Sequence, residues 1–358
     1  MTILITGGAG FIGTRLLAEL ESGSEVVILD SLHPQVHGEA AVEPHFDGRV
    51  RFIRGDVTDP IMWDELLKSV APSTIVHLAA ETGTGQSLLQ ASRHTYVNVH
   101  GTAVMLDALA RNNVLPRSII LTSSRAVYGE GAWESAETGD RFYGQPRTAQ
   151  QLEGAQWSPL GPEGQTGEPI PHEALSVEAR PSNIYAATKL AQENILISWC
   201  ASMSVSLSIL RLQNVYGAGQ ALRNPYTGVL TAFARQALSG EAIDVYEGGG
   251  IVRDFVHVSD VVSALHSAID RPVEGAYRIV DIGSGASDTL AHFATVLTEV
   301  AQSPEIKLSH NYRLGDVRAA FASNSAAERE LGYDPKVKFK DGASELLNWA
   351  RSEISRGN

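Results

Sequence analysis

The chain has 358 residues, of which 43% are hydrophobic and 19% charged, and its formal net charge is −13. This length can bury a full core in two lobes. The negative balance argues against a nucleic acid or an anionic membrane as partner, because phosphate polymers are bound through clustered Lys and Arg.

Short apolar runs alternate with helical patterns through the first 212 residues. Strands are predicted at 3–5, 26–29, 51–53, 74–78, 118–121 and 207–212, because continuous apolar runs of this length are typical of buried parallel strands. Helical spacing occupies segments 14–21, 93–111 and 182–200. This rhythm predicts an α/β fold with a doubly wound parallel sheet of the Rossmann type.

The pattern lapses at about 130–181, a stretch rich in Gly, Pro, Gln and Glu without sustained periodicity. We expect an inserted surface excursion there, with a substrate lid as the alternative. After residue 212 a helix is predicted at 229–238. Strands predicted at 251–258 and 276–282 should return to the main sheet. The chain thus divides into a domain at 1–212 and a smaller α/β lobe at 213–358.

A glycine-rich turn follows the first strand directly. Gly7, Gly10 and Gly13 have the spacing G-x-x-G-x-x-G, and Phe11 and Ile12 lie within it at the start of the next helix. Small residues let the backbone approach a pyrophosphate, which the N–H groups and dipole of the helix N-terminus stabilise. In this strand–turn–helix context the motif predicts a dinucleotide site.

Asp30 closes the second strand. A carboxylate there can accept ribose hydroxyls and repel a 2′-phosphate, and segment 31–48 contains no Lys or Arg, so NAD is favoured over NADP. An ordinary strand-end cap is the alternative for Asp30. After the third strand, Asp56 and Val57 could approach the adenine, although Asp56 could equally cap a helix.

The fourth strand ends with His77 followed by Leu78, Ala79 and Ala80. The small side chains after this strand leave room for a dinucleotide at the carboxyl edge of the sheet. We interpret His77 as a packed residue rather than a ligand.

Two further motifs suggest catalysis. Tyr185 and Lys189 are four residues apart and share one helical face, and a fixed ammonium favours the phenolate form of a nearby phenol. The fifth strand ends in Ser124, whose hydroxyl could bond the same substrate oxygen; Ser123 is its nearest rival. A dinucleotide-binding turn together with a phenol of lowered pKa predicts an enzyme that exchanges hydride at a carbinol carbon.

Together these features resemble the extended short-chain dehydrogenase/reductase family, in particular its nucleotide-sugar epimerases and dehydratases. The resemblance covers nearly the whole chain and includes the segment from Arg253 to Asp260. It implies that Tyr185 is the acid/base, that Lys189 lowers the pKa of Tyr185 and holds the nicotinamide ribose, and that Ser124 orients the reacting oxygen.

The resemblance also implies roles in substrate binding. Asn214 would contact the sugar or phosphate, and Arg253 and Arg313 the nucleotide diphosphate. A structural ion pair with Asp254 or Asp260 is the alternative for Arg253, and plain surface exposure for Arg313. Asn98 would help to order the active site near the cofactor, with helix packing as the alternative.

Finer motifs separate the branches of this family. Its 4,6-dehydratases carry Asp-Glu directly after the catalytic hydroxyl, where this chain has Arg125 and Ala126, so dehydration is disfavoured. Segments 81–87, 212–217 and 224–228 are similar to dTDP-L-rhamnose 4-epimerases and related 6-deoxysugar nucleotide epimerases. Thr82 and Gln86 would then line the sugar pocket.

Alternatives remain at this point. A nucleotide-sugar 4-ketoreductase or a UDP-hexose 4-epimerase would use the same catalytic residues, and a non-catalytic dinucleotide sensor belongs to another class. The resemblance implies a homodimer paired through helices 93–111 and 182–200. Some relatives carry Cys pairs suited to zinc in their counterpart of the insertion, and this chain has none there.

His33, His37 and His45 suggest a metal site, but Pro34 and Pro44 break any helix that would align them. We therefore expect a solvated loop there and no metal.

Cellular location is predicted from what the sequence lacks. The single Cys200 excludes an intrachain disulfide and favours a reducing compartment. The first strand begins at Thr2, which leaves no room for a secretory leader, and no apolar run approaches the roughly 20 residues that span a bilayer. We expect a cytoplasmic protein.

Overall fold

The computed structural model describes residues 1–20, 23–38, 41–44, 46, 48–222, 228–273 and 277–356. Its central sheet has seven parallel strands in the order β3-β2-β1-β4-β5-β9-β14. Their bounds are β1 Thr2–Thr6, β2 Glu25–Asp30, β3 Val50–Arg54, β4 Thr74–His77, β5 Ser118–Ser124, β9 Ser206–Leu212 and β14 Tyr277–Ile282. The doubly wound α/β prediction is confirmed, and all six strands predicted in the first 212 residues are present.

Helices cover both faces of this sheet, because its strands are apolar on both sides. Ile3 and Ile5 of β1 pack with one set of helices, whereas Leu4 between them packs with the other. The first face carries α1 Phe11–Glu19, α10 Val258–Asp270 and α12 Ser325–Leu331; the second carries α3 Pro60–Ser69, α6 Gly101–Arg111 and α8 Ile184–Met203.

The helical segment predicted at 93–111 contains an irregular turn. It runs through α5 Ala91–His94, a π-helical turn η1 Thr95–His100, and α6. π-Turns of this kind are frequent at functional sites. Here the turn contains the buried Asn98.

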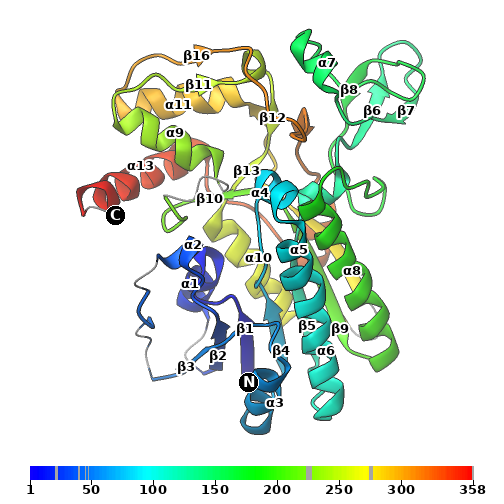
Figure 1. Cartoon of the computed structure of the whole chain (residues 1–358), viewed down its shortest axis with the longest axis vertical. Helices are drawn as coiled ribbons and strands as arrows, with labels where there is room; N and C mark the ends of the chain where they lie inside the picture. The colour runs from blue at the N-terminus through cyan, green and yellow to red at the C-terminus, as the bar shows by residue number, and fades with distance from the viewer. Residues whose placement is uncertain are drawn as a thin grey trace.

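The smaller lobe stands above the carboxyl ends of the sheet strands (Figure 1). Its core gathers around α9 Val229–Leu238, α11 Leu290–Ala301 and α13 Phe339–Ser355. Short strands surround it: β10 Asn214–Tyr216 pairs with β13 Phe255–His257, β11 Asp244–Val245 with β16 Lys307–Leu308, and β12 Val252–Arg253 lies between β15 Asp288–Thr289 and β17 Ala319–Ala320.

The prediction for the two late strands was half right. β14 lies in the main sheet, although residue 276 lies outside the described residues. Segment 251–258 does not join the main sheet but divides into β12 and β13, which belong to two different small sheets. The division falls at Asp254, whose buried carboxylate accepts bonds from the backbone N and the hydroxyl of Ser284.

The insertion at 130–181 is folded rather than structureless. Strand β6 Ala132–Ser135 pairs antiparallel with β7 Arg141–Tyr143 and β8 Gly167–Pro169, and α7 Ala149–Glu153 follows β7 in the chain. Trp133 and Phe142 are buried against Ala319 of the smaller lobe. In Figure 1 the insertion, like that lobe, stands above the carboxyl ends of the sheet strands.

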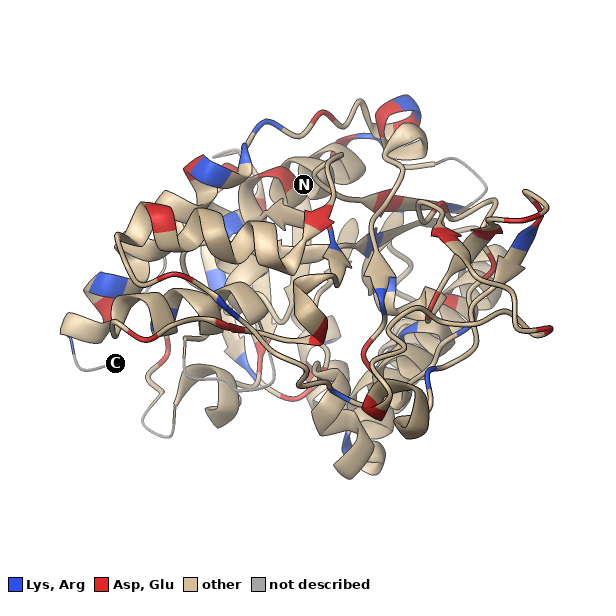
Figure 2. Ribbon diagram, turned by 90° about the horizontal axis from the view of Figure 1, so that it is seen from above, with Lys and Arg blue, Asp and Glu red and all other residues tan. Residues whose placement is uncertain are grey.

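Four short helical elements complete the described structure: α2 Pro34–His37, α4 Thr84–Leu89, and the 3-10 turns η2 Arg125–Tyr128 and η3 Glu247–Gly249. Among the described residues, no helix combines the length and apolarity that crossing a membrane requires. Basic and acidic residues are interspersed over the elements in Figure 2, which fits charges that act locally rather than as one broad field.

Candidate active site

The glycine-rich turn is packed so tightly that it admits no side chains at two positions. Gly7 has φ +69°, and a Cβ there would lie 2.8 Å from the backbone N of Ala79. A Cβ on Gly13 would lie 2.5 Å from the carbonyl oxygen of Gly8. Gly10 directly precedes α1, and the partly buried Phe11 and Ile12 form its first turn. A bare backbone at a helix N-terminus is what a pyrophosphate requires.

Asp30 connects the end of β2 to this turn. Its buried carboxylate accepts hydrogen bonds from the backbone N of Ala9, at 3.0 Å, and of Leu32, at 2.8 Å. The carboxylate is therefore held beside the turn, as recognition of an adenosine ribose requires. The turn and this acid fit NAD.

The remaining predicted cofactor residues lie at the same edge of the sheet. Asp56 is exposed and accepts bonds from the backbone N and hydroxyl of Thr58. The helix-cap alternative for Asp56 is wrong, because Asp59 caps α3. Val57 is buried. Leu78, Ala79 and Ala80 follow β4 directly and are half-buried.

The structure distinguishes the two serines at the end of β5. The buried Ser123 donates a short hydrogen bond to Glu193 of α8, so its hydroxyl points into the core. Ser124 instead caps η2, where its hydroxyl accepts from the backbone N of Ala126 at 3.2 Å, and it lies near enough to Tyr185 to lower the pKa of its phenol. Of the two serines, Ser124 is the one beside Tyr185.

The electrostatics around Tyr185 differ from expectation. Burial raises the pKa of its phenol, against the nearby hydroxyl of Ser124 and the positive charge of Arg125, which both lower it. The prediction that Lys189 lowers this pKa is not what the structure shows. The net pKa is raised, and the cation acting on the phenol is Arg125.

Lys189 belongs to a buried polar chain instead. Its Nζ donates to Oε1 of Gln192 at 2.6 Å, and the Gln192 amide donates to the hydroxyl of Thr102 at 2.8 Å. His77 lies between Thr102 and Thr6, at 3.0 and 2.7 Å. Burial lowers the pKa of Lys189 to about 7, against the carboxylate of Glu193, which raises it. Burial and then the charge of Lys189 lower the pKa of His77 to about 3.

Asn98 connects helix α8 to the segment that follows β4. It accepts from the backbone N of Glu81 and donates to the carbonyl of Glu81 and the hydroxyl of Thr188. The Thr188 hydroxyl in turn donates to the carbonyl of Tyr185. The amide of Asn98 is thus engaged in ordering this part of the site.

Two arginines meet near the predicted sugar contact. Arg125 donates through Nε to the side-chain oxygen of Asn214, at 3.1 Å. Arg253 is buried and donates to Oδ1 of Asp316, at 2.7 Å. The ion pair considered for Arg253 therefore exists, but with Asp316 rather than with Asp254 or Asp260. Sequence reasoning missed this partner because it lies 63 residues away.

The other side chains predicted to bind substrate, those of Arg313, Thr82 and Gln86, are either exposed or bonded to other residues. Arg313 is exposed, and its guanidinium lies 5.6 Å from the ring centre of Tyr246. Thr82 is also exposed. The amide of the buried Gln86 is hydrogen-bonded with Gln35 and Gln90, so its polar atoms are already engaged. Segment 224–227, cited for the subfamily resemblance, lies outside the described residues.

The histidine segment forms no metal site where it is described. The prediction of a loop is wrong at residues 34–37, which form α2, and His33 caps this helix and contacts Arg93 at 3.1 Å. His37 lies 3.8 Å from the carboxylate of Asp30. His45 lies outside the described residues. Across the described ranges no three His, Cys, Asp or Glu side chains are grouped to hold a metal ion.

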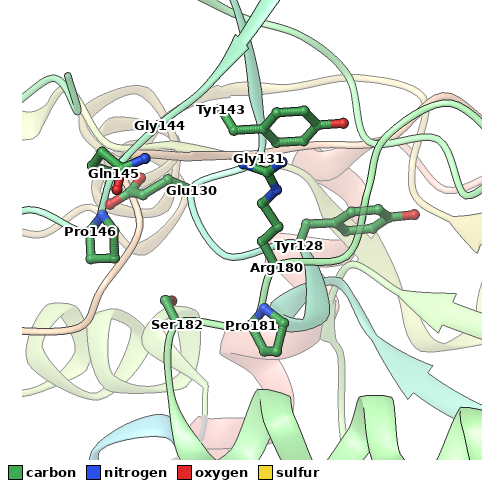
Figure 3. Close-up of a pocket in the computed structure, with 10 residues that line it drawn as sticks. All are labelled: Tyr128, Glu130, Gly131, Tyr143, Gly144, Gln145, Pro146, Arg180, Pro181 and Ser182. Atoms are coloured by element: carbon green, nitrogen blue, oxygen red, sulfur yellow. The ribbon is translucent and has the colours of Figure 1, made fainter. Parts of the chain in front are cut away.

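A cavity of about 270 Å³ opens beside the N-terminus of α8. Figure 3 shows its lining, which comes from the end of η2, from the insertion and from the residue that follows it, and includes Tyr128, Glu130, Tyr143, Arg180 and Ser182. The guanidinium of Arg180 lies 3.9 Å from the ring centre of Tyr143. The insertion therefore contributes surface next to the residues that precede Tyr185.

Comparison with known proteins agrees with this geometry. The model of the family described as "NAD dependent epimerase/dehydratase family" matches residues 3–149 and 160–283. A dTDP-L-rhamnose 4-epimerase of Burkholderia thailandensis is 43% identical over 357 residues, covering 99% of this chain and 96% of that protein.

Solved structures with the same fold include two UDP-glucose 4-epimerases. The Thermotoga maritima enzyme with UDP-glucose has a TM-score of 0.76 at 25% identity, with 99% of this chain and 100% of that chain covered. The Thermus thermophilus enzyme in complex with NAD has a TM-score of 0.75 at 26% identity, with 98% and 99% covered.

Proposed function

This chain belongs to the NAD dependent epimerase/dehydratase family, and we propose that it inverts C4 of a dTDP-6-deoxyhexose such as dTDP-L-rhamnose through a transient 4-keto sugar. The observation that carries the proposal is that Ser124, at the carboxyl edge of β5, lies beside the phenol of Tyr185 and lowers its pKa. This arrangement would put an acid/base and an orienting hydroxyl on one substrate oxygen. The enzyme is NAD-dependent, of the extended short-chain dehydrogenase/reductase type.

Residues of this chain would hold NAD in the way their placement allows. The turn at Gly7, Gly10 and Gly13 would receive the pyrophosphate, and Asp30 the adenosine ribose. Bound NAD supplies a ring carbon that takes up a hydride from the sugar and gives it back. Lys189 would hold the nicotinamide ribose. Its pKa of about 7 leaves the amine partly protonated at neutral pH.

The proton steps belong to the protein. Tyr185 would take the proton of the C4 hydroxyl while Ser124 holds the same oxygen. After the 4-keto sugar has rotated in the pocket to present its opposite face, Tyr185 would return the proton. Arg125 and Ser124 favour the phenolate that this requires, because both lower the pKa of Tyr185. General acid–base catalysis of this kind contributes on the order of 10²–10⁴-fold.

The sugar nucleotide would lie across the two parts of the molecule. We assign 1–212 to the cofactor and 213–358 to the substrate, with Asn214 near the sugar and Arg253 and Arg313 near the diphosphate. The 43% identity to a dTDP-L-rhamnose 4-epimerase supports this nucleotide and this sugar.

We also propose an assembly and a location for the protein. We propose a homodimer paired through α6 and α8, between which a groove of about 600 Å³ is lined by Leu106, Ile195 and Trp199 among others. Light scattering on the purified protein measures the dimer directly. We further propose that the protein is cytoplasmic, a location favoured by its single cysteine.

The test is conversion of a defined substrate. The purified protein is incubated with dTDP-L-rhamnose without added cofactor, and NMR follows the appearance of its C4 epimer, dTDP-6-deoxy-L-talose. Mass spectrometry identifies the cofactor that copurifies. Equilibration of the two sugars with NAD neither added nor consumed is expected, and Tyr185→Phe should abolish it.

The competing functions give different results in the same assay. Turnover that requires added NADPH and a 4-keto sugar would identify a ketoreductase. Equilibration of UDP-glucose with UDP-galactose, but not of the dTDP-sugars, would identify a UDP-hexose epimerase. Biological activity unchanged in Tyr185→Phe would indicate a non-catalytic sensor.

A further inference from the structure

The insertion contains an arginine whose charge is almost fully buried. The side chain of Arg147 is 1% exposed, and its guanidinium donates to four acceptors. These are Oε1 of Glu130 at 3.1 Å, Oε2 of Glu247 at 2.6 Å, and the carbonyl oxygens of Trp157 at 3.0 Å and Asp316 at 2.7 Å.

Burial of the Arg147 guanidinium needs partners from outside the insertion. Moving a guanidinium out of water is expensive, and only complete pairing offsets the expense. Burial alone would lower the pKa of Arg147, but the hydrogen bond with Glu247 and the charge of Glu130 outweigh it, so the pKa is raised and the charge persists. Two of its four acceptors, Glu247 and Asp316, lie in the smaller lobe.

The partners of Arg147 hold the segment 316–318 from two sides. Arg147 binds the carbonyl of Asp316, while Glu130 accepts from the backbone N of Arg318 at 2.9 Å. Glu247, paired with Arg147, also contacts the Arg318 guanidinium at 3.3 Å. The insertion thus fixes the backbone of this segment through groups on both sides of residue 317.

This segment in turn holds the arginine assigned to the diphosphate. Asp316 accepts from Nη2 of Arg253 at 2.7 Å, and the carbonyl of Val317 accepts from the same nitrogen at 2.8 Å. Arg313 lies three residues before Asp316 in the same loop. The orientation of Arg253 therefore depends on a backbone that Arg147 anchors.

We propose that Arg147 is a positioning residue for nucleotide recognition, which sets Arg253 and the Arg313 loop for the substrate diphosphate without touching the substrate. This inference rests on the proposed function, because that function places the diphosphate at Arg253. It assigns to the insertion a part in substrate affinity rather than in the chemical step.

The test compares Arg147→Met and Arg147→Lys with Arg141→Met. This control changes an exposed arginine of the same insertion, whose guanidinium donates to the carbonyl of Ser176. Titration calorimetry with dTDP and with UDP measures nucleotide affinity without requiring turnover. A parallel titration with NAD measures the cofactor site, and steady-state kinetics separate KM from kcat.

Loss of the Arg147 guanidinium should weaken dTDP binding and raise KM for the sugar nucleotide by about tenfold to 100-fold, since a misplacement of about 1 Å can cost on the order of 100-fold. NAD affinity and saturated kcat should stay within about threefold, as expected for loss of uniform binding. Arg147→Lys keeps the charge but not the planar fork, so its dTDP affinity should be intermediate. Arg141→Met should resemble the wild type.

Three results would overturn the inference. One is a dTDP affinity that stays within about twofold of wild type in Arg147→Lys and in the folded fraction of Arg147→Met. A positioning contact predicts a larger loss of affinity in both variants. Another is equal loss of dTDP and NAD binding, which would indicate general unfolding. The third is a wild-type protein that binds neither dTDP nor UDP. If the wild type binds dTDP but converts no 6-deoxysugar, the proposed function fails while the titrations still decide the role of Arg147.

Discussion

Arg125 donates through Nε to the side-chain oxygen of Asn214, 3.1 Å away, and so stands between Ser124 and the smaller lobe. Its charge also acts on the phenol of Tyr185. The residue that stands at the first acid position of the dehydratase pair is therefore a cation beside Tyr185. It has a consequence for the pH dependence of turnover.

Arg125→Met should raise the pKa of Tyr185, because a positive charge that favours the phenolate is lost. Since turnover needs the deprotonated phenol, the acidic limb of the kcat profile should move to higher pH, and activity at pH 7 should fall by roughly tenfold or more. Rates measured from pH 5.5 to 9.5 check this. Arg125→Lys should keep most of the wild-type profile, and an unshifted acidic limb in Arg125→Met would contradict the assignment.

The two adjacent serines should separate catalysis from stability. Ser124→Ala removes the hydroxyl that we propose holds the substrate oxygen, and it should lower kcat by about 100-fold with little change in unfolding free energy. Ser123→Ala removes a buried partner of Glu193, which keeps Arg211 as its ion-pair partner, and should destabilise the fold by about 1–3 kcal/mol. Urea unfolding and initial rates on both variants test the pair; the reverse pattern would make Ser123 the catalytic hydroxyl.

Asp30 should determine the choice between NAD and NADP. Its carboxylate stands beside the glycine-rich turn, and segment 31–48 contains no Lys or Arg to bind a 2′-phosphate. Asp30→Ala should weaken NAD by about tenfold or more and narrow the gap to NADP. Calorimetric titration of both cofactors measures this, and an unchanged NAD affinity would leave Asp30 as a cap of β2 only.

Stability should depend on pH through His172, which is buried against Tyr128 at a ring-centre distance of 4.3 Å. Burial, followed by the charge of Arg125, lowers its pKa to about 3. Below pH 6.5 the imidazole of His172 is therefore protonated in the unfolded chain but not in the folded one. This residue alone should lower the free energy of unfolding by about 1.4 kcal/mol for each pH unit below 6.5. His172→Gln should remove that slope.

Urea unfolding of the protein and of His172→Gln at pH 7, 6 and 5 measures the difference. The comparison is needed because burial raises the pKa of Asp254 to about 6 and that of Asp281 to about 7. These two acids take up protons in the fold, so their contribution has the opposite sign and is lost as pH rises through these values. Parallel slopes in the two proteins would show that His172 does not titrate in this range.

The sequence predicted the elements whose signals are local. Strand β1 and the turn after it could be predicted because an apolar run and three glycines stand together in the chain. The division of segment 251–258 at Asp254 could not, since two-residue strands such as β12 carry no periodicity. The folded insertion was missed because Trp133 and Phe142 bury themselves against Ala319, almost two hundred residues away.

In the site, too, the sequence pointed only to residues with local motifs. Ser124, Tyr185 and Lys189 are marked by spacing, whereas Arg147 has no motif and acts through Glu247 and Asp316, 100 and 169 residues further along the chain. The direction of the Tyr185 pKa shift was also beyond the sequence. It depends on burial and on the side chain of Arg125, and a Lys four residues away on a helix does not reveal either.

The cluster that Trp133 and Phe142 form with Ala319, Val252 and Phe321 has a mechanical consequence. It joins the insertion, which leaves the sheet after β5, to the smaller lobe, and so adds an apolar contact to the ion pair that Arg147 of the insertion makes with Glu247 of the lobe. A hinge rotation that swung the lobe away would expose these rings to water at a free-energy cost of several kcal/mol. Ligand entry and release should therefore proceed through rearrangement of individual loops, with both halves of the molecule remaining docked throughout the catalytic cycle.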